Sequence, residues 1–190
     1  MIIEEGQSLE EAFRAISAEI KRGAVDKRHP FRFVTLATQG QDEVGLRYVV
    51  LRKVTDDFHL YIYTDSRSEK VKHLRTNQQA SLLFYHPGKK LQVKVLGTAQ
   101  VHQLDDLSIA EWKNVQDIGK RAYGPTIAPG EAITHPSVAY HWPESIDDQH
   151  FVVLEVSPKS IEALQLNRME HLRARFTLQN SSWEGQWLAP

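Results

Sequence analysis

The sequence contains no cysteine, which excludes disulfide bonds, thiolate metal sites and cysteine nucleophiles. No apolar run approaches the roughly 20 residues that a membrane-spanning helix needs, and the N-terminus lacks the basic start and apolar stretch of a secretory signal. The formal net charge is only -1, so there is no basic field to collect nucleic acid. We therefore expect a cytoplasmic protein that binds neither nucleic acid nor a membrane.

Motifs of several common enzyme classes are also missing. The chain has no glycine-rich dinucleotide fingerprint, no P-loop and no serine in a nucleophile-elbow context. Nine histidines are present, but the spacing of the densest pair, His135 and His141, matches no zinc signature. We therefore expect no metal site and no catalytic acid, base or nucleophile.

The composition is that of an ordinary globular protein. With 190 residues, 41% of them apolar and 25% charged, we expect one domain over 1–190. The segment within 1–24 predicts an N-terminal helix, because Ser8 and Glu11 form a capping box and Phe13, Ile16 and Ile20 recur at helical spacing. Gly23 is the expected helix stop.

After Pro30 the pattern changes to short alternating segments joined by turns. We expect strands at "FRFVTLAT", "LRYVVLRKV", "FHLYIYT", "ASLLFYH" and "LQVKVLGTAQVH", and then at "HFVVLEV", "SIEALQL", "HLRARFTL" and "WEGQWL". Helices are expected over 66–76 and 105–120, and the proline-rich segment 123–146 reads as an irregular loop. This order predicts a mainly β protein with α elements, an antiparallel barrel with flanking helices.

The stretch "YTDSRSEK", Tyr63 to Lys70, places charges and serines directly after an apolar strand. Asp65 or Ser66 is the expected cap of the following helix, whose N-terminal N–H groups favour an anion. Arg67, Ser68 and Lys70 would add donors there. Basic residues are otherwise disfavoured at this end of a helix, which indicates a phosphate site, but this segment taken alone fits a solvated surface helix better.

The preceding strand supports the phosphate interpretation. "RYVVLR" carries Arg47 and Arg52 at its two ends, and a hairpin would bring it beside the strand that leads to the helix. Strict alternation points the two arginines to opposite faces. Uniting them therefore requires a bulge or a backbone contact.

The sequence resembles the pyridoxamine 5'-phosphate oxidase family in five motifs, which stand in the family's order and spacing: "RYVVLR", "YTDSRSEK", "NQQASLLFY", "LQVKVLG" and the terminal "WLAP". The resemblance covers 31–101 well and 161–190 more loosely. It implies an FMN-binding split barrel that works as a homodimer, with its flavin sites at the subunit interface.

The resemblance also implies roles for individual residues. Arg47, Tyr48, Val49, Val50, Leu51 and Arg52 would line the flavin, with Arg52 also near the substrate phosphate. Tyr63 and Thr64 would contact the isoalloxazine and ribityl chain, Lys70 the phosphate, and Gln92 and Arg175 other parts of the cofactor. His171 and Arg173 would lie nearest the substrate.

The departures from the family pattern fall mostly on the substrate side. Glu69 stands where an arginine would grip phosphate, with Arg67 as its candidate replacement, and Leu164 stands where a tryptophan would pack on the flavin. The family's arginine–leucine–histidine reads His171–Leu172–Arg173. The helix that should bind the substrate phosphate offers Trp112, Gln116 and Lys120. The substrate therefore need not be a B6 vitamer.

Three functions fit these observations. The first is an FMN-dependent oxidoreductase acting on a small molecule, in which the cofactor performs the redox step. The second, motivated by the altered substrate residues, is a flavin-binding or sensing module without turnover. The third is a barrel that holds a different small ligand, such as haem.

Overall fold

The computed structural model describes residues 1–167 and 170–190, in which eight strands form one antiparallel sheet in the order β3-β2-β1-β4-β5-β6-β7-β8. The strands are β1 Phe33–Gln39, β2 Val44–Val54, β3 Leu60–Asp65, β4 Gln79–His86, β5 Leu91–His102, β6 Phe151–Gln165, β7 Leu172–Gln179 and β8 Ser182–Leu188. A further pairing of β3 with β6 closes β1 to β6 into a barrel. The predicted antiparallel barrel is confirmed.

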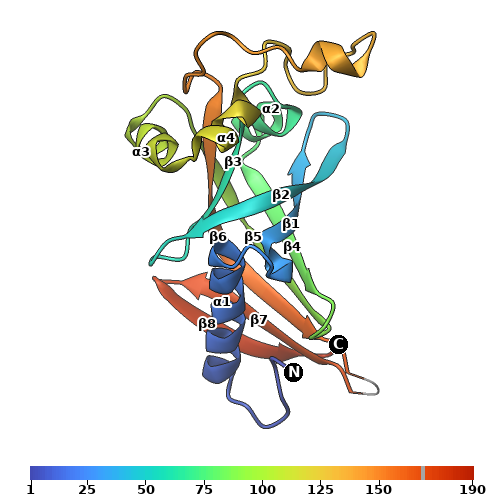
Figure 1. The fold of residues 1–190 in the computed structure, drawn as a ribbon. Coiled ribbons are helices and arrows are strands. Elements are labelled where there is room, and N and C mark those ends of the chain that lie inside the picture. The colour runs from blue at the N-terminus through green and yellow to red at the C-terminus, as the bar shows by residue number, and fades with distance from the viewer. Residues whose placement is uncertain (168–169) are drawn as a thin grey trace.

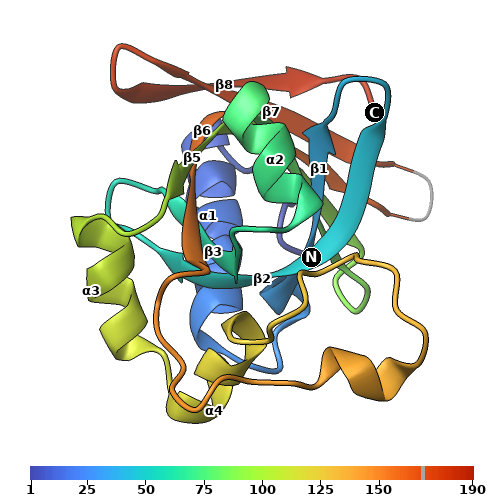
Figure 2. The same cartoon turned by 90° about the horizontal axis from the view of Figure 1, so that it is seen from above.

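The helices lie outside this barrel. They are α1 Leu9–Val25, α2 Glu69–Thr76, α3 Asp106–Asn114 and α4 Asp117–Lys120, with short 3-10 turns at Pro30–Arg32, Arg121–Tyr123 and Pro136–Ala139. α2, α3 and α4 gather at one end of the barrel, whereas β7, β8 and the N-terminal part of α1 lie at the other (Figure 1). The view from above places α2 over the barrel and the loop after α4 along its side (Figure 2).

The sheet splits along β6. The first half of this 15-residue strand pairs with β3 and the second half with β7, while β5 pairs with 153–165. The prediction of two separate strands here, "HFVVLEV" and "SIEALQL", is wrong. The pairing of β5 with β6 shifts register between Leu96 and Gly97, and Gly97 faces Pro158. This irregularity accommodates the proline, so one strand continues through it.

The N-terminal helix follows the prediction except at its end. Ser8 and Glu11 form the expected capping box. Gly23 does not stop the helix, which continues to Val25; a Cβ at Gly23 would lie 2.7 Å from the Cβ of Phe31, so this glycine serves close packing. Phe13 packs on the split part of the sheet, 5.1 Å from the ring of Phe176.

Two other predicted helices begin or end elsewhere. The helix expected from residue 66 begins at Glu69 with Ser68 as its N-cap residue, because the Asp65 carboxylate binds Arg67 and the backbone turns there first. Asp65 and Ser66 are therefore not the caps. The helix expected over 105–120 is broken at 115–116 into α3 and α4, although Asp105 caps it as predicted. Segment 123–146 is irregular apart from its 3-10 turns.

In the part of the chain that the structure describes, none of the helices combines the length and apolar character required to cross a membrane.

A substitution at Gly97 tests how closely β5 approaches β6 where the sheet splits. A Cβ added there would overlap the Ser157 carbonyl oxygen, and backbone cannot move aside as a flexible side chain can. We expect Gly97→Ala to cost about 1–3 kcal/mol of unfolding free energy, the usual cost of overpacking, measured by urea denaturation.

Gly88→Ala is the matched control, since its nearest atom would be His86 Cε1 at 3.6 Å. Equal stability of the Gly97 and Gly88 variants would contradict the close approach of β5 to β6.

Candidate flavin and substrate site

The predicted site residues fall into two groups in the described chain. Arg47, Arg52, Tyr63, Thr64 and Lys70 belong to β2, β3 and α2 at one end of the barrel. Gln92, Arg173 and Arg175 belong to β5 and β7, and the β7–β8 extension lies at the other end (Figure 1). The two groups form no hydrogen bond or ion pair with one another in the described residues.

Arg47 is the centre of the first group. Its side chain is held by the Thr38 hydroxyl at 2.6 Å and the Gly45 carbonyl at 2.7 Å, and it reaches a Glu69 oxygen at 3.4 Å. Thr38 in turn bonds His73 of α2 at 3.1 Å. These contacts fix the guanidinium at the junction of β2 and α2. Val49 and Leu51 follow on the same face of β2, buried in the barrel core.

Lys70 lies beside Arg47 at the start of α2. Its ammonium donates to the Thr64 hydroxyl at 3.0 Å and makes no ion pair with a carboxylate in the described part of the chain. Burial, and then the positive charge of Arg47, lower the pKa of Lys70. A half-buried ammonium beside a guanidinium, with only a neutral direct partner, is suited to an anionic ligand.

The other two donors predicted here are engaged internally. Arg67 binds the Asp65 carboxylate through Nε at 3.0 Å and Nη2 at 2.7 Å, which raises the pKa of Arg67. The Ser68 hydroxyl donates to the Asp65 carbonyl at 2.7 Å and is buried. Asp65 neutralises the charge of Arg67. Arg67 therefore does not replace the arginine that the family pattern has at the position of Glu69.

Arg52 lies in a separate groove below α3 and α4. The pairing of β2 with β3 shifts register between Leu51 and Lys53, so a bulge occurs at this residue. The expected convergence of Arg52 and Arg47 on one phosphate is wrong, because the two side chains have different surroundings. The Arg52 guanidinium lies 5.7 Å from the Tyr63 ring centre. The groove has a volume of about 310 Å³ and is lined by Lys27, Arg52, Tyr63, Asn114, Val115, Gln116, Ile118, Gly119 and Tyr123.

A buried carboxylate fixes Tyr63 in this groove. The Tyr63 hydroxyl donates to Glu111 of α3 at 2.6 Å, and Lys53 binds the other oxygen of Glu111 at 2.7 Å. Burial, reinforced by this hydrogen bond, raises the pKa of Tyr63. Trp112 packs against Phe151 at 5.1 Å instead of lining the groove. Of the family's substrate-phosphate positions, the structure thus brings Arg52 and Gln116 together.

The second group lies on the outer face of the sheet. Cross-strand partners lie on one face, and the ladder places Tyr48, Thr35, Leu83, Lys94, Glu162, Arg175 and Gln186 in one row. Gln92, Leu164 and Arg173 form a neighbouring row. Tyr48 lies on β2 of the closed barrel, whereas Arg175 lies on β7 of the extension beyond it, and the ladder does not pair these two strands.

Glu162 organises the polar part of this face. It is 7% exposed and accepts hydrogen bonds from Arg173 and Arg175, with Lys94 at 3.4 Å. Burial alone would raise the pKa of Glu162, but the arginine hydrogen bonds and the lysine outweigh it and lower the pKa to about 2. His171, by contrast, is exposed and accepts the Asn167 N–H at 3.1 Å in the β6–β7 connection.

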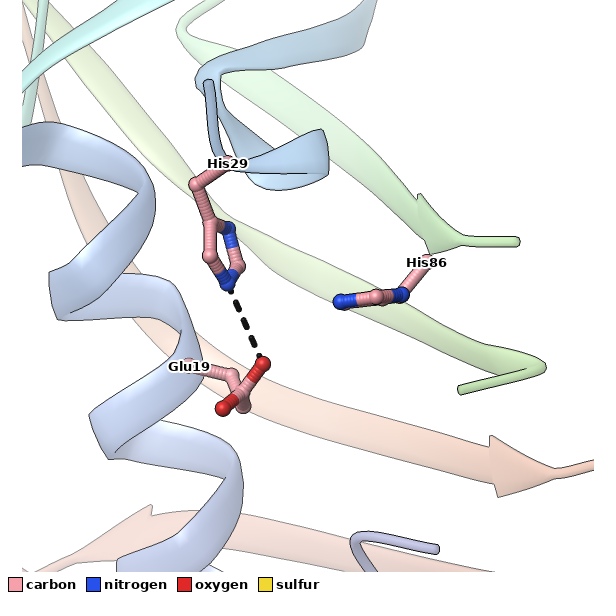
Figure 3. A group of neighbouring side chains, drawn as sticks. All are labelled: Glu19, His29 and His86. Atoms are coloured by element: carbon pink, nitrogen blue, oxygen red, sulfur yellow. Dashed lines mark hydrogen bonds and ion pairs between the residues drawn. The ribbon is translucent and has the colours of Figure 1, made fainter. Parts of the chain in front are cut away.

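Glu19, His29 and His86 form a group with metal-ligating atoms within 4.8 Å of one another (Figure 3). His29 Nδ1 accepts the Phe31 N–H at 3.1 Å, and His86 Nδ1 accepts the Lys89 N–H at 3.1 Å. Each neutral ring therefore carries its proton on Nε2, which leaves no lone pair there for a metal. His29 Nε2 instead bonds Glu19 at 3.1 Å, so the group stabilises α1 against the barrel.

A second group, Glu43, Glu69 and His73, also has its ligating atoms within 4.8 Å. Arg47 already lies 3.4 Å from Glu69. This guanidinium supplies the positive charge that a cation would bring, so the group does not suit a metal.

The closed six-strand barrel, its strand extension and the flanking helices define the split-barrel class of proteins. The sequence profile described as pyridoxamine 5'-phosphate oxidase matches residues 23–165. The chain belongs to the pyridoxamine 5'-phosphate oxidase family. A comparison with curated proteins finds no match.

Solved structures share this fold. A pyridoxamine 5'-phosphate oxidase-related, FMN-binding protein from Nostoc punctiforme is 21% identical, with a TM-score of 0.79 over 97% of this chain and 100% of that one. PhzG from Burkholderia lata, solved with tetrahydrophenazine-1-carboxylic acid, is 17% identical, with a TM-score of 0.72 over 96% and 90%. General stress protein 26 from Bacillus anthracis is 19% identical, with a TM-score of 0.52 over 80% and 98%. At these identities the likeness establishes the fold alone.

Sequence reasoning missed Thr38, Lys94, Glu111 and Glu162. Glu162 had a signal: it is the one acid in the apolar strand segment "SIEALQL", and a carboxylate there calls for cationic partners. Thr38 and Glu111 had none, because their partners are distant in the sequence and only the barrel brings them together.

Glu162 predicts acid sensitivity of the β5–β7 region. Its pKa is lowered from 4.5 to about 2 on folding, so its stabilising contribution is fully present above pH 4.5 and is lost as the pH falls towards 2. We expect the stability difference between the parent and Glu162→Gln, measured by urea denaturation, to shrink across that window. A difference that stays constant from pH 6 to pH 2.5 would show that the ionised carboxylate is not what stabilises the fold.

Proposed function

We propose that this protein binds FMN and acts as an FMN-dependent oxidoreductase on a small molecule. The observation that carries the proposal is the Arg47–Lys70 pair at the junction of β2 and α2: Lys70 is half-buried and has no carboxylate bound to it in the described chain. Membership of the family and the FMN-binding relative with the same fold support the choice of FMN.

The donors at this junction suit a phosphate ester. Arg47 is oriented by Thr38 and Gly45, and Lys70 by Thr64. Charge-assisted hydrogen bonds contribute about 1.5–3 kcal/mol each. Two of them would supply a large part of the roughly 8 kcal/mol that micromolar affinity requires.

FMN supplies the hydride-accepting ring when bound. The residues of this chain bind and orient it. Arg47 and Lys70 would hold the phosphate and 47–51 would line the ring, while the Tyr63 ring is kept in place because its hydroxyl is fixed to Glu111. No side chain of the described chain needs to transfer a proton in this scheme.

The groove at Arg52 is our candidate for one end of the substrate. Arg52 and Lys27 supply positive charge, and Tyr63 and Tyr123 supply aromatic surface. The replacement of the family's phosphate-binding residues by Trp112, Gln116 and Lys120 favours a substrate other than a B6 vitamer, bearing an acidic group smaller or less charged than a phosphate.

We also propose that the protein is a homodimer with the site at its interface. The outer face of β2, β1, β4 and β5 exposes large apolar side chains: Phe33, Leu46, Tyr48, Leu83, Tyr85 and Leu96. Exposed apolar patches of this kind mark association surfaces. A second copy on this face would bring its own Gln92 and Arg175 towards the flavin that Arg47 and Lys70 hold.

Removal of the phosphate-binding charges tests the cofactor assignment. We expect Arg47→Ala and Lys70→Ala each to weaken FMN binding roughly ten- to hundredfold, the loss of one charge-assisted contact, and to change riboflavin binding little. Flavin fluorescence titration measures both affinities. Because a bound phosphate favours the charged form of Lys70, the preference for FMN over riboflavin should also fall as the pH rises through the pKa of Lys70.

Lys72→Ala is the matched control, since Lys72 is exposed on the same helix. If the Arg47 and Lys70 variants bind FMN as tightly as the Lys72 variant, the phosphate is held elsewhere.

The proposed dimer interface predicts that a charge introduced into it disrupts the dimer. Tyr48 is 76% exposed in the single chain, so Tyr48→Asp leaves the monomer fold intact and places a charge in the proposed contact. We expect light scattering to show a dimer for the parent and a monomer for the variant, with weaker FMN binding. A parent that is monomeric at micromolar concentration would refute the interface.

The altered substrate residues keep a second function open, a flavin-binding module without turnover. Mixing the FMN-loaded protein with amines, B6 vitamers and nicotinamide donors separates the two. Bleaching of the flavin absorbance by any of them identifies an oxidoreductase, whereas bound FMN that none of them reduces favours the module.

A further inference from the structure

A second groove, the split groove, lies where the sheet divides along β6. β3 pairs with this strand up to Val156 and β7 pairs from Ser160, so within the described ladders 157–159 have no strand on that edge. The split groove has a volume of about 520 Å³. Its walls come from α1, the turn between β2 and β3, and the β7–β8 hairpin, which lies next to that turn (Figure 1). The described residues that line it include none of the predicted flavin or substrate residues.

Three aromatic rings form the apolar wall of the split groove. Trp183 of β8 lies 5.2 Å from Phe13 of α1 and 6.3 Å from Phe58 of the β2–β3 turn, measured between ring centres. Phe58 has a φ of 66°, in the left-handed region where a turn usually carries glycine. A bulky residue persists in this conformation only where its surroundings hold it. Phe13 and Trp183 are only partly buried, so the rings that hold Phe58 also face the open groove.

The polar atoms of the split groove are mainly acceptors that lack donors. Asp56 and Asp57 are exposed in the β2–β3 turn and form no ion pair in the part of the chain that the structure describes. His59 Nδ1 bonds the Glu155 carboxylate at 2.8 Å, so the neutral ring donates there and keeps a lone pair on Nε2. The Ser17 hydroxyl is shielded from solvent and has no hydrogen-bond partner in the described chain. Such a hydroxyl is uncommon in folded proteins, and it belongs to a wall that a ligand would complete.

The charges of the split groove favour a cationic ligand. Its lining holds two aspartates and one lysine, Lys21, which leaves one negative charge in excess when His59 is neutral. Lys21 is exposed on α1 and makes no ion pair with either aspartate in the described residues, so the carboxylates are not neutralised within the chain. An ammonium group has three N–H donors and no acceptor, which matches a lining of free acceptors. Aromatic rings attract the same charge through their faces.

We propose that the split groove binds a small primary amine with a flat apolar body. The ammonium group lies against Asp56 and Asp57 at the β2–β3 turn, and the apolar body lies on the rings of Phe13, Phe58 and Trp183. The inference goes beyond the proposed function, because the lining shares no residue with the proposed flavin and substrate positions.

NMR titration of the ¹⁵N-labelled protein with benzylamine, with and without added FMN, tests the proposal. The chain has four tryptophans, and the variant Trp183→Phe identifies the indole N–H signal of Trp183. We expect benzylamine to shift this signal saturably and to move the other indole signals less. Benzyl alcohol has the same ring without the charge. It should bind about tenfold more weakly, since it lacks the charge-assisted contact.

The double variant Asp56→Asn with Asp57→Asn tests the aspartates, because asparagine keeps the turn chemistry and removes the charge. We expect its benzylamine affinity to fall about tenfold and its benzyl alcohol affinity to stay the same. The matched control is Asp42→Asn with Glu43→Gln, which removes two exposed acidic charges from the β1–β2 turn and should bind like the parent. Lys21→Gln removes the competing cation and should strengthen benzylamine binding about two- to threefold. It serves if the aspartate variant does not fold.

The proposal is overturned if benzylamine leaves the Trp183 signal in place, if benzyl alcohol binds as tightly as benzylamine, or if the aspartate variant matches its control. The two FMN conditions keep this site apart from the proposed function. Equal benzylamine affinities with and without FMN support a separate groove, whereas binding that requires FMN places the amine at the flavin and refutes it. A protein that binds benzylamine at Trp183 but takes up no FMN refutes the proposed function alone.

Discussion

The structure depends on one strand, β6, that pairs with different strands along its two halves. β6 pairs with β3 over its first half, which closes the barrel, and with β7 over its second half, which extends the sheet beyond the barrel. Gly97 makes the necessary close approach of β5 to β6 possible. This split divides the site residues between two ends of the molecule, one at α2 and one on β7. In the proposed homodimer, a second copy of the chain would bring them to one ligand.

The cationic side chains at the two ends of the molecule have different partners. At the barrel end, Arg47 and Lys70 are held mainly by neutral oxygens, from Thr38, Gly45 and Thr64, so their charge is available to a ligand. On the extension, Glu162 is buried among its cations and orients two of them. The first arrangement leaves most of the positive charge available to an anionic ligand, whereas in the second a buried carboxylate offsets part of it.

The fold could be read from the sequence because its determinants are local. Alternation in "FHLYIYT" and "LQVKVLGTAQVH" fixed the strands, and Ser8 with Glu11 fixed the start of α1. A bulge does occur at Arg52, but it does not unite the two arginines of this strand, because Arg52 lies in the groove beside Tyr63 and Arg47 lies against Thr38. The predictions that failed did so because other contacts, local or distant, took precedence. Gly23 does not end α1, because its missing Cβ makes room for Phe31. Asp65 does not cap α2, because it binds Arg67. The Glu162 cluster required the register of three strands, which periodicity alone does not give.

A crystal structure of the protein grown with FMN tests the central claim most directly. The account predicts that the phosphate lies within hydrogen-bond distance of Arg47 and Lys70 of one protomer, with β7 of a second protomer facing the same flavin. A phosphate bound away from both cations, or a flavin contacted by a single chain only, would contradict it.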